Sequence, residues 1–335
     1  MEPERDDGVA AAMSSVAAPS TPVDVAVLVA RGAFEDFWRR LRHDYLALAA
    51  ACFIVVVIVA AIAGAPLVAW VTGHPPDKQF LNGLTIDGIP LPPFSRELGP
   101  DGLHADPHGQ FFVLGTDTLG RDVLVRLLYG ARISLFVAFV ATGIALFIGV
   151  VLGMVAGYFR GFGDAIISRG IETAMAFPAL LFAVGFAAVI GAGLTNVIIV
   201  ITLFSWYYPA RVVRSAVLSL RETPFIEAAH MIGASHFRIM FRHLLPQLTA
   251  PIIVYATGVI AANILFEAGL SYLGLGVPPP TASWGQMLSD GVSNGLYRVQ
   301  PWLALIPGLT LASLMLAFQL LGDGLRDALA TKSAT

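Results

Sequence analysis

The chain has 335 residues, of which 56% are hydrophobic and only 13% charged, and its formal net charge is -3 at neutral pH. This composition, together with a positive mean hydropathy, excludes an ordinary soluble globular domain and predicts a polytopic membrane protein. The near-neutral charge without a basic stripe argues against nucleic-acid binding, and the single cysteine, Cys52, excludes a disulfide or cysteine metal site within the chain.

Residues 1–44 precede the first apolar run. The stretch 1–30 is rich in Ala, Ser, Pro and Asp without a sustained period, which predicts a disordered tail. The stretch from Arg31 to Asp44 is basic, with apolar side chains at helical spacing: Phe34, Phe37, Trp38 and Leu41. This pattern favours an amphipathic helix that lies along the inner membrane surface before the first span.

Six apolar runs are long enough to cross the hydrocarbon core of a bilayer, which needs about 20 residues. A polar loop, 72–132, separates the first run from a core of five, 133–321, and 322–335 forms a short tail. The third run contains Pro178. The predicted spans are 45–71, 133–158, 171–190, 197–213, 252–270 and 303–321.

The basic residues predict the orientation of these spans. Of the 20 lysines and arginines, 14 fall on the side that holds both termini and 6 on the other. Because positive charge is enriched on the cytoplasmic side, both termini should be cytoplasmic and the loop 72–132 extracytoplasmic.

The polar stretch between the fourth and fifth spans predicts a hairpin of two short helices on the cytoplasmic side. Thr223 can cap the first helix with Pro224 at its first position, and Gly233 can end it. Ser235 can cap the second helix, which Pro246 should stop. Such a hairpin is a candidate contact for another protein.

Small residues line one face of the second predicted span. Gly149, Gly153 and Gly157 recur every four residues, which favours close packing of helices within the bundle. Subunit dimerisation and a mobile pore seam are the alternatives.

Charged side chains are absent from every predicted span centre, where each would cost about 2.5 to 3.5 kcal/mol. Those nearest, Glu172, Arg211, Arg214 and Glu267, fall near span ends, where snorkelling or capping explains them. A stand-alone channel or secondary transporter would need charged side chains at mid-membrane. It remains the runner-up hypothesis.

Catalytic motifs are missing from the sequence. The two lysines, Lys78 and Lys332, do not follow a glycine, so no Walker A loop can be written and ATP is not bound by that route. HExxH and Gly-x-Ser-x-Gly are also absent, and the histidines and aspartates of the outer loop are a weak metal candidate: Asp101, His104, Asp106 and His108. We therefore predict no enzyme, no metal site and no cofactor bound by this chain.

Four motifs, in order, carry a resemblance to a known family. EAAHMIG followed by HLLP resembles the EAA loop of permease subunits in ATP-binding-cassette (ABC) importers. The motifs LGTDTLGRDVLVRLLYGARISL, EAGLSYLGLGVPPPTASWG and LLGDGLRDAL are similar to the C-type permease of dipeptide and oligopeptide importers. The resemblance covers roughly Tyr45 to Leu329.

This resemblance implies an all-α fold of the type I importer class, with six transmembrane helices in a prokaryotic cell membrane. It also implies that the EAA loop, about 215–246, is a coupling hairpin that docks on a cytoplasmic ATPase. Gly233 would let the two short helices cross closely, and Glu227 would pair with a basic residue of the partner. The residues implied in coupling are Glu227, Ala228, Ala229, Gly233, Leu245 and Pro246.

The family further implies partners: a homologous second permease, two ATPases that bind ATP and Mg²⁺, and an extracytoplasmic binding protein. The implied substrate is a peptide, while close relatives carry nickel, glutathione or other small solutes. The hairpin could alternatively be a DNA-binding helix-turn-helix, but its position between two spans leaves little room.

Turn and capping residues cluster in the segment GTDTLGRD, just before the second span. They predict a structural outer cap, with contact to a binding protein as an alternative. The residues of this cap are Gly115, Asp117, Gly120, Arg121 and Asp122.

Overall fold

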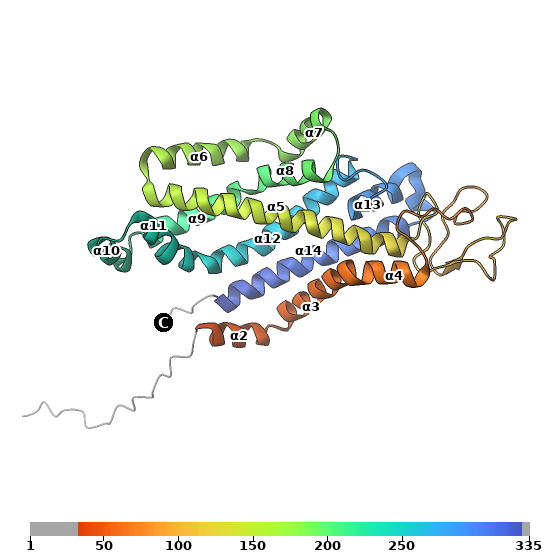
Figure 1. Cartoon of the computed structure of the whole chain (residues 1–335), viewed down its shortest axis with the longest axis horizontal. Coiled ribbons are helices and arrows are strands. Elements are labelled where there is room, and N and C mark those ends of the chain that lie inside the picture. Colours follow the sequence, from red (N-terminus) through yellow and green to blue (C-terminus); the bar gives the residue numbers. More distant parts are fainter. Residues whose placement is uncertain (1–32, 330–335) are drawn as a thin grey trace, which may run out of the picture.

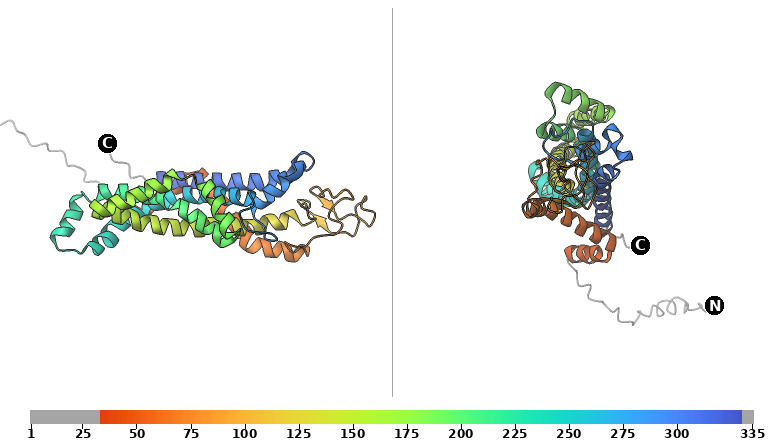
Figure 2. Two further views of the ribbon diagram at one scale, coloured as in Figure 1. Left: turned by 90° about the horizontal axis from the view of Figure 1, so that it is seen from above. Right: turned by 90° about the vertical axis from the view of Figure 1, so that its right-hand side faces the viewer.

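The computed structural model describes residues 33–329, so the predicted tail of residues 1–30 lies outside the described part. Helices run side by side along the long axis of an elongated bundle (Figures 1 and 2). One end carries the start of α3, the end of α14 and the helices α10 and α11, and the other end carries the long loop (Figure 1). The only strands described, β1 (Ser95–Arg96) and β2 (Phe111–Phe112), pair antiparallel in this loop.

The amphipathic segment forms α2 (Ala33–His43), in which the Arg42 guanidinium lies 5.0 Å from the centre of the Trp38 ring. Asp44 then caps α3 (Tyr45–Val59), accepting hydrogen bonds from the backbone nitrogens of Leu46 and Ala47. A π-helical turn, η1 (Ala60–Gly64), and α4 (Ala65–Thr72) continue the helix to Thr72. This first helix therefore spans 28 residues.

The second helix, α5 (Val123–Phe159), begins ten residues before the predicted start at 133, so the loop ends at 122. Asp122 explains the early start, because its carboxylate caps the helix by accepting from the backbone nitrogens of Leu124 and Val125. The two arginines in residues 123–132, Arg126 and Arg132, have polar partners within the protein. Arg132, for example, donates to the carbonyls of Ala61 and Ile62 in the π-helical turn.

The predicted third span, 171–190, is broken near Pro178. The chain forms α6 (Gly161–Ala176) and α7 (Ala179–Ile190), which are bent by 85° at a break between them. Pro178 restricts the residue before it to extended backbone, and Phe177 has a ψ of 130°. Within residues 33–329, five helices are long and apolar enough to cross a membrane, or six if the bent pair forms one span.

The fourth helix consists of α8 (Leu194–Ser205) and α9 (Tyr207–Leu220), which together span 27 residues. The last helix, α14 (Trp302–Leu329), continues eight residues past the predicted end at 321, into the segment predicted as a tail. Between the fifth and last helices lie α13 (Trp284–Val292) and a 3-10 turn, η3 (Ser293–Arg298).

Pro246 does not stop the second helix of the hairpin, contrary to the prediction. The chain runs without interruption from α11 (His236–Arg238) through a π-helical stretch, η2 (Ile239–Leu244), into α12 (Leu245–Tyr272). Pro246 occupies the start of α12, directly after the wider π-helical turn. A proline is tolerated there because the missing N–H group would have had no regular i-4 partner.

The glycine row of α5 faces α9. A Cβ atom on Gly149 would lie 2.6 Å from the carbonyl oxygen of Trp206, and one on Gly153 would lie 2.5 Å from that of Ala210. On Gly157 it would lie 2.8 Å from the carbonyl oxygen of Arg214. Only glycine, which has no Cβ atom, permits this separation, so the two helices approach backbone to backbone over about two turns.

Gly153→Ala should therefore destabilise the protein by about 1–3 kcal/mol, because the added methyl group meets a backbone carbonyl that cannot rotate away. Gly143 provides a matched control on the same helix, since a Cβ there would meet nothing within 4 Å. Gly143→Ala should stabilise by up to about 1 kcal/mol through helix propensity. Thermal unfolding in one detergent compares both variants, and equal midpoints would contradict the packing role.

Candidate functional site

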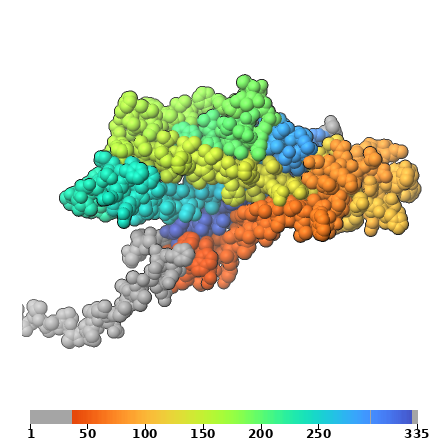
Figure 3. Space-filling model, viewed as in Figure 1, coloured from red at the N-terminus to blue at the C-terminus, as the bar shows by residue number. Residues whose placement is uncertain are grey.

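The hairpin of residues 223–246 protrudes from one end of the bundle (Figures 1 and 3). Its first helix, α10 (Pro224–Met231), follows Thr223, whose hydroxyl donates to the carbonyl of Leu220 instead of capping the helix. Gly233 has a φ of +76° and ends this arm. Ser235 caps α11, with its hydroxyl accepting from the backbone nitrogen of Arg238 at 3.3 Å.

The expected close crossing of the two short helices at Gly233 is wrong. A Cβ on Gly233 would meet nothing within 4 Å, so no helix passes close to it. Glycine is favoured here by the positive φ alone, because a side chain is strained in that conformation.

The six EAA-loop residues fall into two groups. Glu227, Ala228, Gly233 and Pro246 are exposed, whereas Ala229 is 4% exposed and Leu245 is half-buried against the same apolar cluster. That cluster joins the hairpin to the bundle and includes Ile226, Ile239 and Leu244 from the hairpin and Met154, Val213 and Val217 from α5 and α9. The Glu227 carboxylate makes no ion pair or hydrogen bond to any residue in the described part of the chain.

Large apolar side chains are exposed beside Glu227. Met231 and Ile232 are 84% and 83% exposed, and Phe237 is 67% exposed with its ring centre 4.3 Å from that of Phe241. Phe225 and Phe241 complete this group, the hairpin face, at 41% and 43%. Sequence reasoning missed the hairpin face, because apolar residues such as Ile226 and Ile239 in the same segment are buried. The exposed and the buried apolar residues of the hairpin can be told apart only from the positions of its two helical arms in the structure.

A cavity of about 490 Å³ lies beside α7, α8, α9 and α12, at mid-length of the bundle. Five aromatic side chains contribute to its lining: Phe204, Tyr207, Tyr208, Tyr255 and Phe266. Arg326 is the only charged side chain in the lining, within the described residues.

A chain of buried polar side chains forms one edge of this cavity. The hydroxyl of Ser205 donates to Oδ1 of Asn263 at 2.7 Å, and Nδ2 of Asn263 donates to the hydroxyl of Thr142 at 2.8 Å. These bonds connect α8, α12 and α5 at a depth where lipid offers no partner. Sequence reasoning missed Asn263, since a single amide in an apolar run has no distinctive spacing.

Snorkelling does not explain Glu267, in contrast to the prediction. This residue is completely buried, and its carboxylate accepts hydrogen bonds from Ser134 and Ser271, each at 2.7 Å. Arg214 likewise forms a two-pronged ion pair with Asp164, at 2.5 and 2.8 Å. Both groups are satisfied inside the protein rather than by headgroups.

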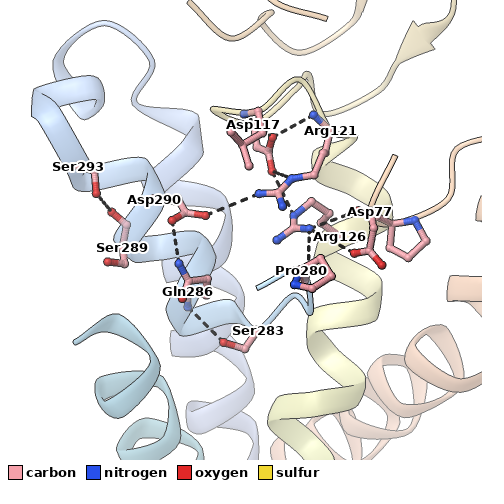
Figure 4. Close-up of polar contacts among 12 residues, drawn as sticks. Asp77, Asp117, Arg121, Arg126, Pro280, Ser283, Gln286, Ser289, Asp290 and Ser293 are labelled. Carbon is pink, nitrogen blue, oxygen red and sulfur yellow. Dashed lines mark hydrogen bonds and ion pairs between the residues drawn. The ribbon is translucent and has the colours of Figure 1, made fainter. Parts of the chain in front are cut away.

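The predicted outer cap is a buried ionic cluster that joins three separate segments (Figure 4). Asp117 accepts from Nε of Arg121 at 2.7 Å and lies 3.2 Å from Nε of Arg126. Arg126 also donates to the carbonyl of Pro280 at 3.2 Å, and Arg121 lies 4.0 Å from Asp290 on α13. Burial is the largest of the causes that raise the pKa of Asp290 above its ordinary value.

The remaining cap residues shape the loop around this cluster. Gly115 and Gly120 have φ values of +76° and +72°, and a Cβ on either would lie within 2.3–2.7 Å of a carbonyl oxygen. Asp122 forms a buried pair with Nδ1 of His74 at 2.5 Å while it caps α5. Two residues of the weak metal candidate pair with each other instead. The Asp101 carboxylate lies 2.6 Å from Nδ1 of His104, and this hydrogen bond lowers the pKa of Asp101 to about 2.

Comparison with known proteins adds to this geometry. Residues 149–333 match the family described as "Binding-protein-dependent transport system inner membrane component". The chain belongs to this family. Residues 32–93 also match the N-terminal transmembrane domain of oligopeptide transport permease C. It is therefore a multi-pass inner membrane component of an ABC transporter, and not the catalytic ATPase.

Among its relatives is the glutathione transport system permease protein GsiD of Pectobacterium atrosepticum, 36% identical over 302 residues, covering 90% of this permease and 92% of the relative. The same protein in Escherichia coli O157:H7 is 39% identical, with 90% and 91% covered. A Brucella abortus protein provisionally named as a peptide transport system permease is 36% identical over 322 residues, covering 95% and 96%.

A solved structure of the MetNI methionine ABC transporter in an inward-facing conformation contains a chain of the same fold. The TM-score is 0.51 at 21% identity, and the match covers 61% of this permease and 96% of that chain. This similarity supports the type I permease fold.

Asp117→Asn should destabilise the outer cap by about 3–5 kcal/mol, because two buried arginines lose their shared carboxylate. Asp77→Asn is the matched control, since the Asp77 side chain is 52% exposed and 3.9 Å from Arg126. It should cost less than about 1 kcal/mol. Thermal unfolding and limited proteolysis of the loop report both effects, and a protease-resistant Asp117→Asn loop would contradict the cap role.

Proposed function

We propose that this permease forms half of a translocation pathway for peptides and couples it to cytoplasmic ATPases through the hairpin of residues 223–246. The observation that supports the proposal best is the hairpin face. Exposed large apolar side chains beside a carboxylate that is unpaired within residues 33–329 are characteristic of a surface that another protein covers. The motif EAAHMIG lies at its centre.

The hairpin must be cytoplasmic for this role. It lies beyond the start of α3 and the end of α14 along the same direction of the bundle, which supports one compartment for all of these (Figure 1). The excess of lysine and arginine on that side supports a cytoplasmic assignment, with both termini there and the loop of residues 73–122 outside.

We propose that the residues that line the aromatic cavity form part of the wall of the translocation pathway. Its tyrosine side chains and Asn263 offer neutral hydrogen-bonding groups that suit peptide amides, beside the charged lining residue Arg326. Relatives named for glutathione and for peptide transport are compatible with a small peptide as substrate. Glutathione, nickel or another small solute is the alternative, and specificity would rest mainly with the binding protein.

The complete transporter would contain a second, homologous permease, two ATPases that bind ATP and Mg²⁺, and an extracytoplasmic binding protein. Purification of the tagged chain from its native membrane in mild detergent, with mass spectrometry of the bound proteins, tests this composition. We expect two ATPase subunits and a second permease. Recovery of this chain with copies of itself alone would instead favour the channel hypothesis.

Met231→Asp in the hairpin face should reduce recovery of the ATPases at least about tenfold. The reason is that an apolar side chain that the bound ATPase would bury is replaced by a charge. Leu81→Asp is the control, since Leu81 is 97% exposed but lies in the loop at the opposite end. That variant should retain the ATPases. If both variants bind ATPases equally, the hairpin face is not their docking surface.

Glu227→Arg should leave the chain inserted in the membrane but uncouple ATP hydrolysis from uptake, because the carboxylate would pair with a basic group of the ATPase. Uptake and hydrolysis are measured together in vesicles of the complete transporter. Full uptake would exclude this role for Glu227. The purified permease alone should hydrolyse no ATP, because its sequence cannot form a Walker A loop.

A further inference from the structure

The hydroxyl of Tyr158 contacts both arms of the hairpin. Tyr158 is the next-to-last residue of α5 and is only 5% exposed. Its oxygen lies 2.8 Å from Nδ1 of His236 on α11 and 3.4 Å from Nε2 of His230 on α10. The phenol ring also stacks on the His230 ring, at 6.2 Å and 10°, and meets His236 edge to face. One side chain therefore joins two helices to a third.

This contact differs in kind from the rest of the hairpin's attachment. The apolar cluster around Ile226, Ile239 and Leu244 is not directional, and the Phe159 ring meets the His236 ring edge to face at 5.8 Å. Within residues 33–329, no other side-chain hydrogen bond or ion pair joins residues 224–238 to another element. The Tyr158 hydroxyl therefore makes the polar side-chain contact between this part of the hairpin and α5, while α11 is also continuous with α12.

Tyr158 is also fixed on the side of the bundle. Its carbonyl accepts from Nη1 of Arg221 at the end of α9, at 2.5 Å. The preceding residue, Gly157, lies against the backbone of α9 at Arg214. α9 continues from α8, and these two helices line the cavity with Ser205 and Tyr208.

We propose that Tyr158 is a positioning residue for energy coupling: its hydroxyl, held between His230 and His236, makes the hairpin move with α5 and α9 as one body. The inference rests on the proposed ATPase coupling. A phenol hydroxyl has one proton, so it donates to one imidazole and accepts an N–H from the other. In the assignment tested below, it donates to Nδ1 of His236 and accepts from Nε2–H of His230.

Three variants test this role without changing the hairpin face. Tyr158→Phe removes only the hydroxyl, and His236→Ala removes its acceptor. His236→Asn is the matched rescue, because the asparagine Oδ1 can take the place of Nδ1 and accept the same proton. Each variant is prepared as the complete transporter with its binding protein, in proteoliposomes, with radiolabelled glutathione and di-alanine as probes.

The measured quantity is ATP hydrolysed per solute molecule taken up. In Tyr158→Phe and His236→Ala this ratio should rise about fivefold, the factor that the loss of one hydrogen bond corresponds to. His236→Asn should stay within twofold of the unmodified ratio, and all three variants should retain their ATPases. A merely structural role would lower the amount of assembled transporter and leave the ratio unchanged.

Unchanged coupling in Tyr158→Phe, or a His236→Asn variant as uncoupled as His236→Ala, would overturn the role of Tyr158 alone. ATPases missing even from the unmodified transporter would overturn the proposed function as well. The two failures are distinguishable, because the first appears in the ratio and the second in the subunit composition.

Discussion

Close contact between the backbones of α5 and α9 is the constraint on which the rest of the arrangement depends. In lipid, apolar side chains gain little by leaving the solvent, so helices associate where their backbones can approach. The row Gly149, Gly153 and Gly157 allows that approach, and carbonyl oxygens of α9 occupy the space that side chains would fill. With this pair fixed, α8 is placed beside the cavity at one end of α9, and the hairpin follows at the other.

Several buried polar groups are satisfied by the protein itself. Glu267 is completely buried yet accepts from two serines, and Asn263 bonds to Ser205 and Thr142. The arginines at the outer end of α5 lie in a cluster with Asp117 rather than in water. An unpaired charge or amide in these places would cost several kcal/mol. The bonds of Glu267 and Asn263 also connect α5, α8 and α12, so they help to fix the relative positions of these helices.

The sequence predicts features that depend on local chemistry. Ser235 as a cap, the positive φ at Gly233 and the existence of long apolar helices all follow from neighbouring residues. The two prolines show where this reasoning fails. Pro178 breaks a helix into two at 85°, whereas Pro246 lies inside a continuous helix because a π-helical turn precedes it. Which outcome occurs depends on tertiary packing, which a single sequence does not reveal.

The candidate site illustrates the same limit on a larger scale. The EAA motif locates the hairpin, but exposed Ile232 and buried Ile226 are equally apolar, and only the fold assigns them to opposite faces. The buried face joins the hairpin to α5 and α9, and the exposed face is not covered by any part of residues 33–329. A hairpin that packs on the bundle through one apolar face and presents another to water transmits force only if its orientation is fixed. Apolar packing is not directional, whereas the helical continuity of α11 with α12 and the hydrogen bonds of Tyr158 are, so the proposed coupling depends on these two features.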